Sequence, residues 1–193
     1  MDLITTLGRT LGFSFAAGVN LYATVALLGL ASRFGWVQLP EQYQAFNNDW
    51  IIGAAVAMYL IEFFADKIPY VDTLWDIVHT AIRPVGGALI AVTTLGDASP
   101  GMEAMVALLG GAVATSSHLT KTSTRAAANA SPEPFSNWLL SLGEDVFVVG
   151  LGFLAMKHPV AAFVVATVLL ALIALFAVVI VRTVRGWFRR RFA

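Results

Sequence analysis

The amino-acid sequence predicts an all-α integral membrane protein with about six membrane helices. Of the 193 residues, 58% are hydrophobic and only 12% are charged. Soluble domains are about 45–50% apolar and about 25% charged, so this composition indicates a chain embedded in a lipid bilayer. The ten-residue segments of alternating hydrophobicity that are typical of membrane β-barrels do not occur. We therefore expect a single helical membrane domain that covers residues 1–193.

The composition also argues against several classes of function. Basic and acidic residues number twelve each, and no concentrated basic face indicates a nucleic-acid partner. The chain has no cysteine, which excludes disulfides and thiolate metal sites. Motifs for nucleophilic catalysis, zinc proteolysis and phosphate binding are missing, and the loops between the apolar stretches are short. We therefore expect neither enzymatic activity nor a cofactor.

The apolar stretches predict how the domain is organised. Residues 10–32 and 160–181 carry no charge and are long enough to cross a membrane, which requires about 20 apolar residues. Between these two framing helices we expect two hairpin-like units, 50–95 and 103–157. Each unit consists of short apolar pieces on either side of a polar block, which predicts a short, broken hairpin.

The polar block of the first unit is the most informative part of the sequence. Glu62 and Asp66 are four residues apart and share one helix face. Pro69 suits the first turn of a new helix, which is amphipathic. One stripe of this helix carries Asp72, Asp76, His79 and Arg83. Ionisable groups near membrane depth are costly, so they mark functional positions.

Glycine and proline residues follow this helix. Pro84, Gly86 and Gly87 predict an interruption, after which a short apolar helix ends at Leu95. The glycine pairs 86–87 and 110–111 also permit close helix packing.

The second unit has a similar polar block. A stripe at helical spacing carries His118, Lys121, Arg125 and Asn129, and the segment 131–134 ends that helix. With a shift of 65 residues, Pro69 aligns with Pro134, and Asp72 and Asp76 align with Asn137 and Ser141. Paired interrupted segments in two halves are typical of transporter binding sites. The match is open to two interpretations, an internal repeat of proline-led amphipathic helices or chance.

Basic residues predict the topology. If the arginine-rich C-terminal tail is cytoplasmic and the chain crosses six times, ten basic residues lie inside and only Arg33 and Lys157 lie outside. This count places both termini, and Arg9, in the cytoplasm.

The polar blocks resemble a known family. The run LIEFFADKIPYVDTLWDIVHTAIRPVGG, from Leu60 to Gly87, is similar to the signature of the uncharacterised membrane family DUF 4126. The later segments SHLTKTSTRAAAN and SNWLLSLGEDVF match in the same order. The resemblance implies a multi-pass protein of the bacterial inner membrane and no assigned chemistry.

We interpret the chain as a small secondary transporter or channel for an ion or small solute. Carboxylates beside imidazole suit proton transfer, and clusters of oxygen ligands suit hard cations, so a cation or a proton is the expected partner. The metal candidates are Asp72, Asp76 and His79. The candidate pathway residues are Asn20, Glu62, Asp66, Asp72, Asp76, His79, Arg83, His118, Lys121, Arg125, Asn129, Glu144 and Asp145.

Other interpretations stay open. The amphipathic helices could lie at the membrane surface with a wet polar stripe, as in a scaffold or assembly protein. The basic stripe and the arginine tail could instead serve lipid handling. Lys67 and an arginine of another helix could neutralise Glu62 and Asp66, and Lys121 or Arg125 could pair with Glu144 or Asp145. The small number of crossings also favours a homodimer.

Overall fold

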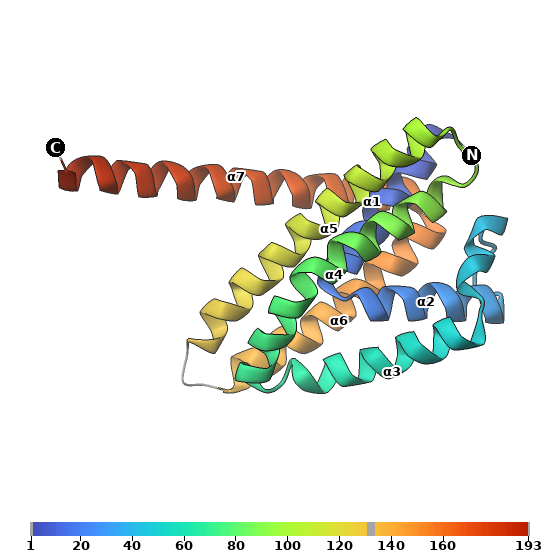
Figure 1. The fold of residues 1–193 in the computed structure, drawn as a ribbon, viewed down its shortest axis with the longest axis horizontal. Helices are drawn as coiled ribbons and strands as arrows, with labels where there is room; N and C mark the ends of the chain where they lie inside the picture. The colour runs from blue at the N-terminus through green and yellow to red at the C-terminus, as the bar shows by residue number, and fades with distance from the viewer. Residues whose placement is uncertain (1, 131–133, 193) are drawn as a thin grey trace.

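The computed structural model describes residues 2–130 and 134–192, and these residues form helices without strands (Figure 1). Side chains at positions 69, 134, 186 and 189–192 are not described. The helices are α1 (Leu3–Val19), α2 (Leu21–Phe34), the 3-10 helix η1 (Glu41–Phe46), α3 (Asp49–Ala65), α4 (Pro69–Leu95), α5 (Pro100–Asn129), α6 (Pro134–Lys157) and α7 (Pro159–Phe192). The predicted helical class is confirmed.

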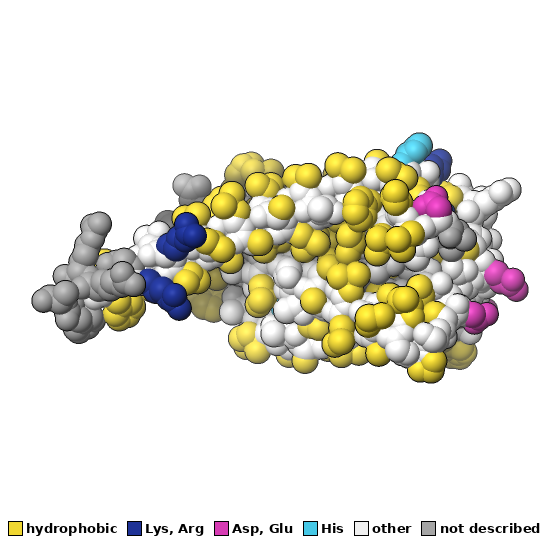
Figure 2. All heavy atoms as spheres, turned by 90° about the horizontal axis from the view of Figure 1, so that it is seen from above, with side chains coloured by type: hydrophobic (Ala, Val, Ile, Leu, Met, Phe, Trp, Pro, Cys, Tyr) yellow, Lys and Arg dark blue, Asp and Glu magenta, His cyan; other side chains and the backbone are white. Residues whose placement is uncertain are grey.

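Three helical segments are long and apolar enough to cross a membrane, namely Tyr70–Leu95, Phe135–Lys157 and Pro159–Arg185. The apolar helices α1 and α2 are shorter. In Figure 2 the charged side chains of the visible face lie at the two ends of the long axis, and apolar and uncharged surface separates them. The chain is therefore a helical membrane protein. The number of crossings and the internal repeat remain predictions.

The framing helix predicted for residues 10–32 is wrong, because the chain breaks at Asn20. This residue has φ −148° and ψ 100°, an extended conformation between α1 and α2. Its backbone N–H still donates to Ala16 O at the end of α1. Its side-chain Oδ1 accepts from the Ala23 N–H at 2.9 Å and so caps α2. Asparagine favours such cap positions because its amide competes with the backbone for hydrogen bonds.

The interruption predicted at Pro84, Gly86 and Gly87 is also wrong, because α4 continues through all three residues to Leu95. The glycines provide close packing instead, as the sequence also suggested. A Cβ atom at Gly87 would overlap the Ala114 side chain of α5, and one at Gly86 would overlap Leu21. The two proline-led helices are confirmed, since α4 begins at Pro69 and α6 at Pro134. The break predicted at 131–134 lies partly outside the described residues.

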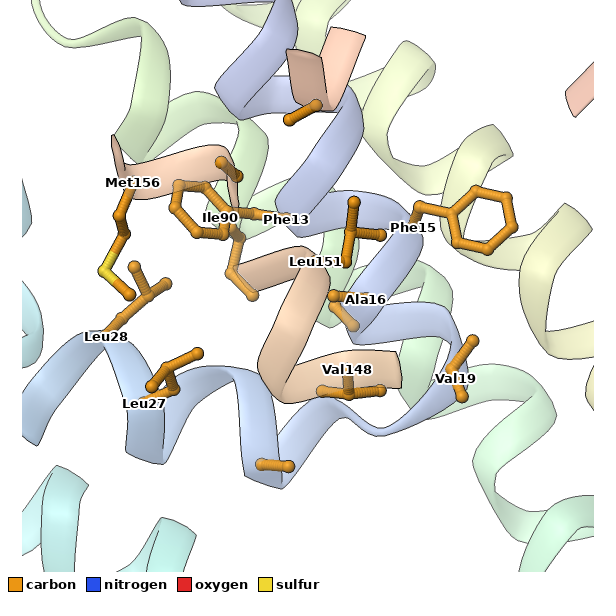
Figure 3. Packing of buried hydrophobic residues seen from close by; sticks show 14 of the residues in the cluster. Phe13, Phe15, Ala16, Val19, Leu27, Leu28, Ile90, Val148, Leu151 and Met156 are labelled. Carbon is orange, nitrogen blue, oxygen red and sulfur yellow. The ribbon is translucent and has the colours of Figure 1, made fainter. Parts of the chain in front are cut away.

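Helix α1 forms the centre of the bundle, and its residues from Gly8 to Val19 are all buried. Its apolar side chains meet those of α2, α4 and α6 (Figure 3). Phe13 and Leu28 are completely buried, and so is Val148 of α6. The central position of α1 brings the break at Asn20 into the interior, beside the polar stripes of α4 and α5.

The packing at the start of α1 differs from the predicted topology. Arg9 Nη2 donates to Met156 O at 3.5 Å, and a Cβ atom at Gly8 would overlap Pro159 O. Arg9 therefore lies beside the α6–α7 turn, whereas the count of basic residues had placed Arg9 and Lys157 on opposite sides. The count had assumed one continuous helix over residues 10–32, whereas these residues form two helices that meet at Asn20. The side chains of Arg189, Arg190 and Arg191, which that count includes, lie outside the described side chains.

Helix α7 projects far beyond the bundle (Figure 1). From Leu172 onward it exposes Leu172, Leu175, Phe176, Val178, Val179, Ile180, Val181 and Val184. Apolar surface of this extent is stable only in contact with lipid or with another protein.

We expect the substitution Gly110→Ala to destabilise the bundle. A Cβ atom there would overlap Ala91 and lie 2.7 Å from Gly87 O, so α4 and α5 would have to separate. Overpacking of this kind costs about 1–3 kcal/mol. The matched control is Gly53→Ala, because nothing lies within 4 Å of a Cβ atom at that exposed helix position. Thermal unfolding of the purified protein in detergent measures both. Equal melting temperatures for the two variants would contradict the packing argument.

Candidate functional site: a buried network of charges

The structure gathers most of the candidate residues into one buried polar region between α3, α4, α5 and α6. Glu62, Arg83 and His118 are completely inaccessible to solvent. The other buried members are Asn20, Asp66, Asp72, Asp76, His79, Lys121 and Arg125. Asn129, Glu144 and Asp145 are half-buried at its border. The polar stripe of α4 thus faces the protein interior and not water, contrary to the structure that the surface-scaffold interpretation assumed.

Arg83 connects four parts of the network. Its Nη2 donates to Glu62 Oε1 at 2.6 Å, within a pair that is completely buried. Its Nη1 donates to Gly18 O at 3.3 Å and to His118 Nδ1 at 2.7 Å. The same nitrogen lies 3.4 Å from Asp76 Oδ1. One guanidinium therefore joins α3, α4, α5 and the end of α1.

Lys121 and Arg125 form the second centre. Lys121 Nζ lies 2.9 Å from Asp66 Oδ2 and 3.3 Å from Glu62 Oε1. Arg125 binds Glu144 with two parallel hydrogen bonds, of 3.0 Å from Nε and 2.6 Å from Nη2. Such two-point pairs are strong and fix the orientation of both groups. Arg125 also contacts Asp66 Oδ2 at 3.2 Å, so three cations face three carboxylates across the bundle.

The predicted pairings are confirmed for Glu144, and for Glu62 and Asp66 with arginines of other helices, but are wrong for Lys67. Lys67 Nζ donates to Phe63 O at 2.8 Å and to Ser141 Oγ at 3.3 Å, and it lies over the Phe63 ring. Burial lowers the pKa of this lysine, which lies in the turn between α3 and α4. Glu62 and Asp66 pair with cations from α4 and α5 instead, because those helices cross the end of α3.

Hydrogen bonds define the tautomers of both buried histidines. A guanidinium has only donors, so His118 Nδ1 must accept from Arg83, and Nε2 carries the hydrogen. That Nε2 lies 3.0 Å from Thr80 Oγ1. In His79, Nδ1 donates to Trp75 O at 2.7 Å, and Nε2 is hydrogen-bonded to the Tyr22 hydroxyl at 2.9 Å. The His118 ring is neutral in this arrangement, and neither ring has a nitrogen left for a metal.

The break at Asn20 faces this network. The Gly18 carbonyl, at the C-terminal end of α1, accepts from Arg83. Asn20 Nδ2 donates to Asp145 Oδ1 at 3.3 Å, beside the N-terminal end of α2. A helix carries partial negative charge at its C-terminus and partial positive charge at its N-terminus. Each free helix end therefore lies near a side chain of the opposite charge.

Asp72 and Asp76 stand apart from the paired carboxylates. They line a cleft of about 350 Å³ between α4 and α5. Asp72 Oδ2 accepts from Asn129 Nδ2 at 3.0 Å, whereas the buried Asp72 Oδ1 and Asp76 Oδ1 accept no hydrogen bond. His79 therefore does not join Asp72 and Asp76 as the predicted third metal ligand, because its ring nitrogens are bound to Tyr22 and Trp75. Within the described ranges, no group of three or more histidine, cysteine or acidic side chains could hold a metal ion.

The structure adds residues that the list of candidates missed. Asn137 Oδ1 accepts from Arg125 at 2.7 Å, and its Nδ2 donates to Asp66 O at 3.0 Å. Asn137 and Ser141 occupy the positions that the predicted repeat aligns with Asp72 and Asp76, so that alignment could have identified them. Tyr22 gave no signal in the sequence, because its contact with His79 depends on the break at Asn20.

Comparison with known proteins identifies the family. The family model described as "Domain of unknown function (DUF4126)" matches residues 7–179, and the chain belongs to this family. No curated protein and no solved structure matches the chain. The match covers both polar blocks and the helix break.

We expect the substitution Arg125→Gln to lower the free energy of unfolding by about 3–5 kcal/mol, because it leaves buried carboxylates without their cation. Arg182→Gln, at an exposed position of α7, is the matched control. The double substitution Arg125→Gln with Glu144→Gln should recover part of the loss, since the remaining pair is neutral. Unfolding in mixed detergent micelles, followed by tryptophan fluorescence, measures all three. Equal stability of the Arg125→Gln and Arg182→Gln variants would contradict the proposed contribution of the Arg125–Glu144 pair to the free energy of unfolding.

Proposed function

We propose that the protein is a small secondary transporter or channel that moves a cation or proton, alone or with a small solute, through the buried network. The observation that carries this proposal is the break of the first apolar segment at Asn20 against buried ionisable groups. Non-helical backbone at membrane depth is tolerated only where protein buries it or where it lines a cavity. Transporters bind their substrates and coupling ions beside such broken helices.

The charges at the break support this function. Arg83 meets the end of α1 and Asp145 lies at the start of α2, so the two half-helices are stabilised by side chains that belong to the network. If the charge of one such side chain changed, the adjacent helix end would lose a favourable interaction. Binding of an ion and movement of the broken helix are linked in this way.

Arg83 is the element that couples the cleft to the break. It approaches Asp76 in the cleft at 3.4 Å, while it holds Glu62 and Gly18 O. Neutralisation of Asp76 by a bound proton or cation weakens its attraction for Arg83. The guanidinium then shifts toward Glu62, and its hold on the end of α1 changes. The position of Arg83 therefore depends on whether an ion or proton occupies the cleft, and this position affects the end of α1 at the helix break.

Lipid handling is a second candidate, favoured by a different observation. An apolar groove of about 670 Å³ lies between α5 and α7, with Phe15 of α1 and Phe147 of α6 in its wall. A narrower pocket shares these two phenylalanines and reaches Lys121. An acyl chain fits the chemistry of this groove. Phospholipid that remains bound after extensive detergent exchange, detected by native mass spectrometry, would favour this second function over transport.

The proposed transport is tested in proteoliposomes. We expect ion flux in vesicles that contain the protein, measured with trapped dyes for protons, Na⁺, K⁺ and Mg²⁺. The substitution Asp76→Asn should reduce this flux at least tenfold, because it removes the carboxylate that faces Arg83. Asp97→Asn, at an exposed position in the α4–α5 turn, is the matched control and should transport like the wild type.

Two outcomes would contradict the proposal. One is the absence of flux for all four ions while the reconstituted protein remains folded. The other is a flux that Asp76→Asn leaves unchanged, since the path would then bypass the network. Intact folding of each variant is checked by its elution profile and melting temperature.

A further inference from the structure

We infer that the cleft between α4 and α5 binds one partly hydrated divalent cation of the Mg²⁺ class through the carboxylates of Asp72 and Asp76. This inference rests on the proposed function, because it names the ion that the network moves or uses for coupling. Four features of the cleft support this ion: its charge balance, the unpaired oxygen of Asp72, the other ligands and its size.

The charge balance shows that the two aspartates of the cleft are in surplus, as is Asp145, which binds the amide of Asn20 outside the cleft. Arg83, Lys121 and Arg125 are matched by three carboxylates that contact them at 2.6–2.9 Å, those of Glu62, Asp66 and Glu144. Asp76 reaches only Arg83, at 3.4 Å, and this guanidinium is already bound to Glu62. Asp72 accepts from the neutral amide of Asn129. A second pair of charges in a buried site is expensive unless a counter-charge joins them.

Asp72 has an unpaired oxygen at the cleft. Its side chain is completely buried, and among the described residues nothing donates to its Oδ1. Asp76 is 4% exposed, and its Oδ1 accepts no hydrogen bond but lies 3.4 Å from Arg83 Nη1. Glu62 Oε2, Asp66 Oδ1 and Asp145 Oδ2 are unpaired as well, but these residues do not line the cleft. The two residues are four apart in α4, so their side chains lie on one helix face, with Cβ atoms about 5–6 Å apart. Two carboxylates in this arrangement can bind the same ion or its water shell.

The remaining polar lining consists mainly of hydroxyl oxygens, from Thr73, Thr80, Thr122 and Ser123. The Thr80 hydroxyl donates to Asp76 O, and the Thr122 hydroxyl donates to Leu119 O. Both hydroxyls therefore have their protons bound, and Thr80 Oγ1 also accepts from His118 Nε2, which leaves it one lone pair. Arg125 also lines the cleft, but its donors are bound to Asp66, Glu144 and Asn137. These are ligands for a cation and not for an anion.

The type of ligand selects the type of cation. All offered atoms are oxygens, because both nitrogens of His79 are bound elsewhere, and oxygen ligands suit hard cations. Only two carboxylates line the cleft, so a complete protein cage for Ca²⁺ is not formed. Mg²⁺ keeps several of its waters and is held by one or two carboxylates. One divalent ion also neutralises both surplus charges, which a monovalent ion or one proton does not.

The size of the cleft agrees with a hydrated ion. Its volume of about 350 Å³ is far more than bound protons need. A water molecule takes about 30 Å³ in the liquid, so the cleft has room for an ion with several waters. The volume thus agrees with a hydrated cation as well as with water around protonated aspartates, and a response to Mg²⁺ separates the two.

Binding is tested without flux, on the purified full-length protein in detergent. We expect MgCl₂ to raise the melting temperature of the wild type in a saturating manner, and NaCl at the same ionic strength to have no such effect. The double substitution Asp72→Asn with Asp76→Asn should abolish the response to Mg²⁺. It should also raise the melting temperature measured without Mg²⁺, because it removes the surplus charges. Asp97→Asn should respond like the wild type.

A second measurement on the wild type alone does not depend on the folding of any variant. Mn²⁺ is used as a paramagnetic substitute for Mg²⁺. We expect one equivalent of Mn²⁺ to bind, seen as loss of the free-ion electron paramagnetic resonance signal, and to be released by Mg²⁺ but not by Na⁺. Bound Mn²⁺ should show exchangeable water protons in pulsed experiments, since the site keeps part of the water shell.

The outcomes separate this inference from the proposed function. Binding of Mg²⁺ or Mn²⁺ in a protein that gives no flux supports the site and overturns transport. Flux of protons or Na⁺ in a protein that binds neither divalent ion supports transport and overturns the site. A melting temperature that rises on acidification and is insensitive to Mg²⁺ assigns the aspartates to protons and also overturns the site. A response to Mg²⁺ that the double variant retains places the ion elsewhere and overturns the assignment.

Discussion

The buried pairing of three cations with three carboxylates is the constraint on which the rest of the structure depends. Arg83, Lys121 and Arg125 meet Glu62, Asp66 and Glu144 in a region where water cannot screen or replace these contacts. Removal of any one partner leaves a charge that the surrounding helices cannot solvate. Because the six residues come from α3, α4, α5 and α6, the pairing also determines how these helices pack. Glycine contacts between α4 and α5 bring the two stripes close enough for it.

The helix break adds a second level of organisation. Apolar packing of α1 against α2, α4 and α6 holds Asn20 in the interior, where an unwound backbone would otherwise be costly (Figure 3). The cost is offset by the cap on Ala23 N and by the contacts of Gly18 O and Asn20 with the network. The break and the charges therefore stabilise each other. A site with these two features, and with a surplus of negative charge in an adjoining cleft, suits the passage of a cation.

Local chemistry made much of this predictable from the sequence. Composition gave the class, proline gave the starts of α4 and α6, and helical spacing placed Asp72, Asp76, His79 and Arg83 on one stripe. The predictions that proved wrong concern features that depend on tertiary contacts. The break at Asn20 occurs inside an apolar segment, where an asparagine usually forms an interhelical bond. Pro84 and the following glycines do not interrupt α4, because packing against α5 and Leu21 supports the helix. An arginine of another helix was expected beside Glu62, but which arginine it is, and that Lys67 takes no part, depends on how α3, α4 and α5 meet.

The long separations within the network have a consequence for how the protein is made. Glu62 and Asp66 precede Lys121 by 59 and 55 residues, so a ribosome completes α3 well before this partner leaves the exit tunnel. During that interval the end of α3 cannot enter hydrocarbon without exposing unpaired carboxylates. The end of α3 must then wait at the membrane surface, or in the insertion machinery, until α5 arrives. We therefore expect α3 to α6 of this small protein to be released into lipid together rather than helix by helix.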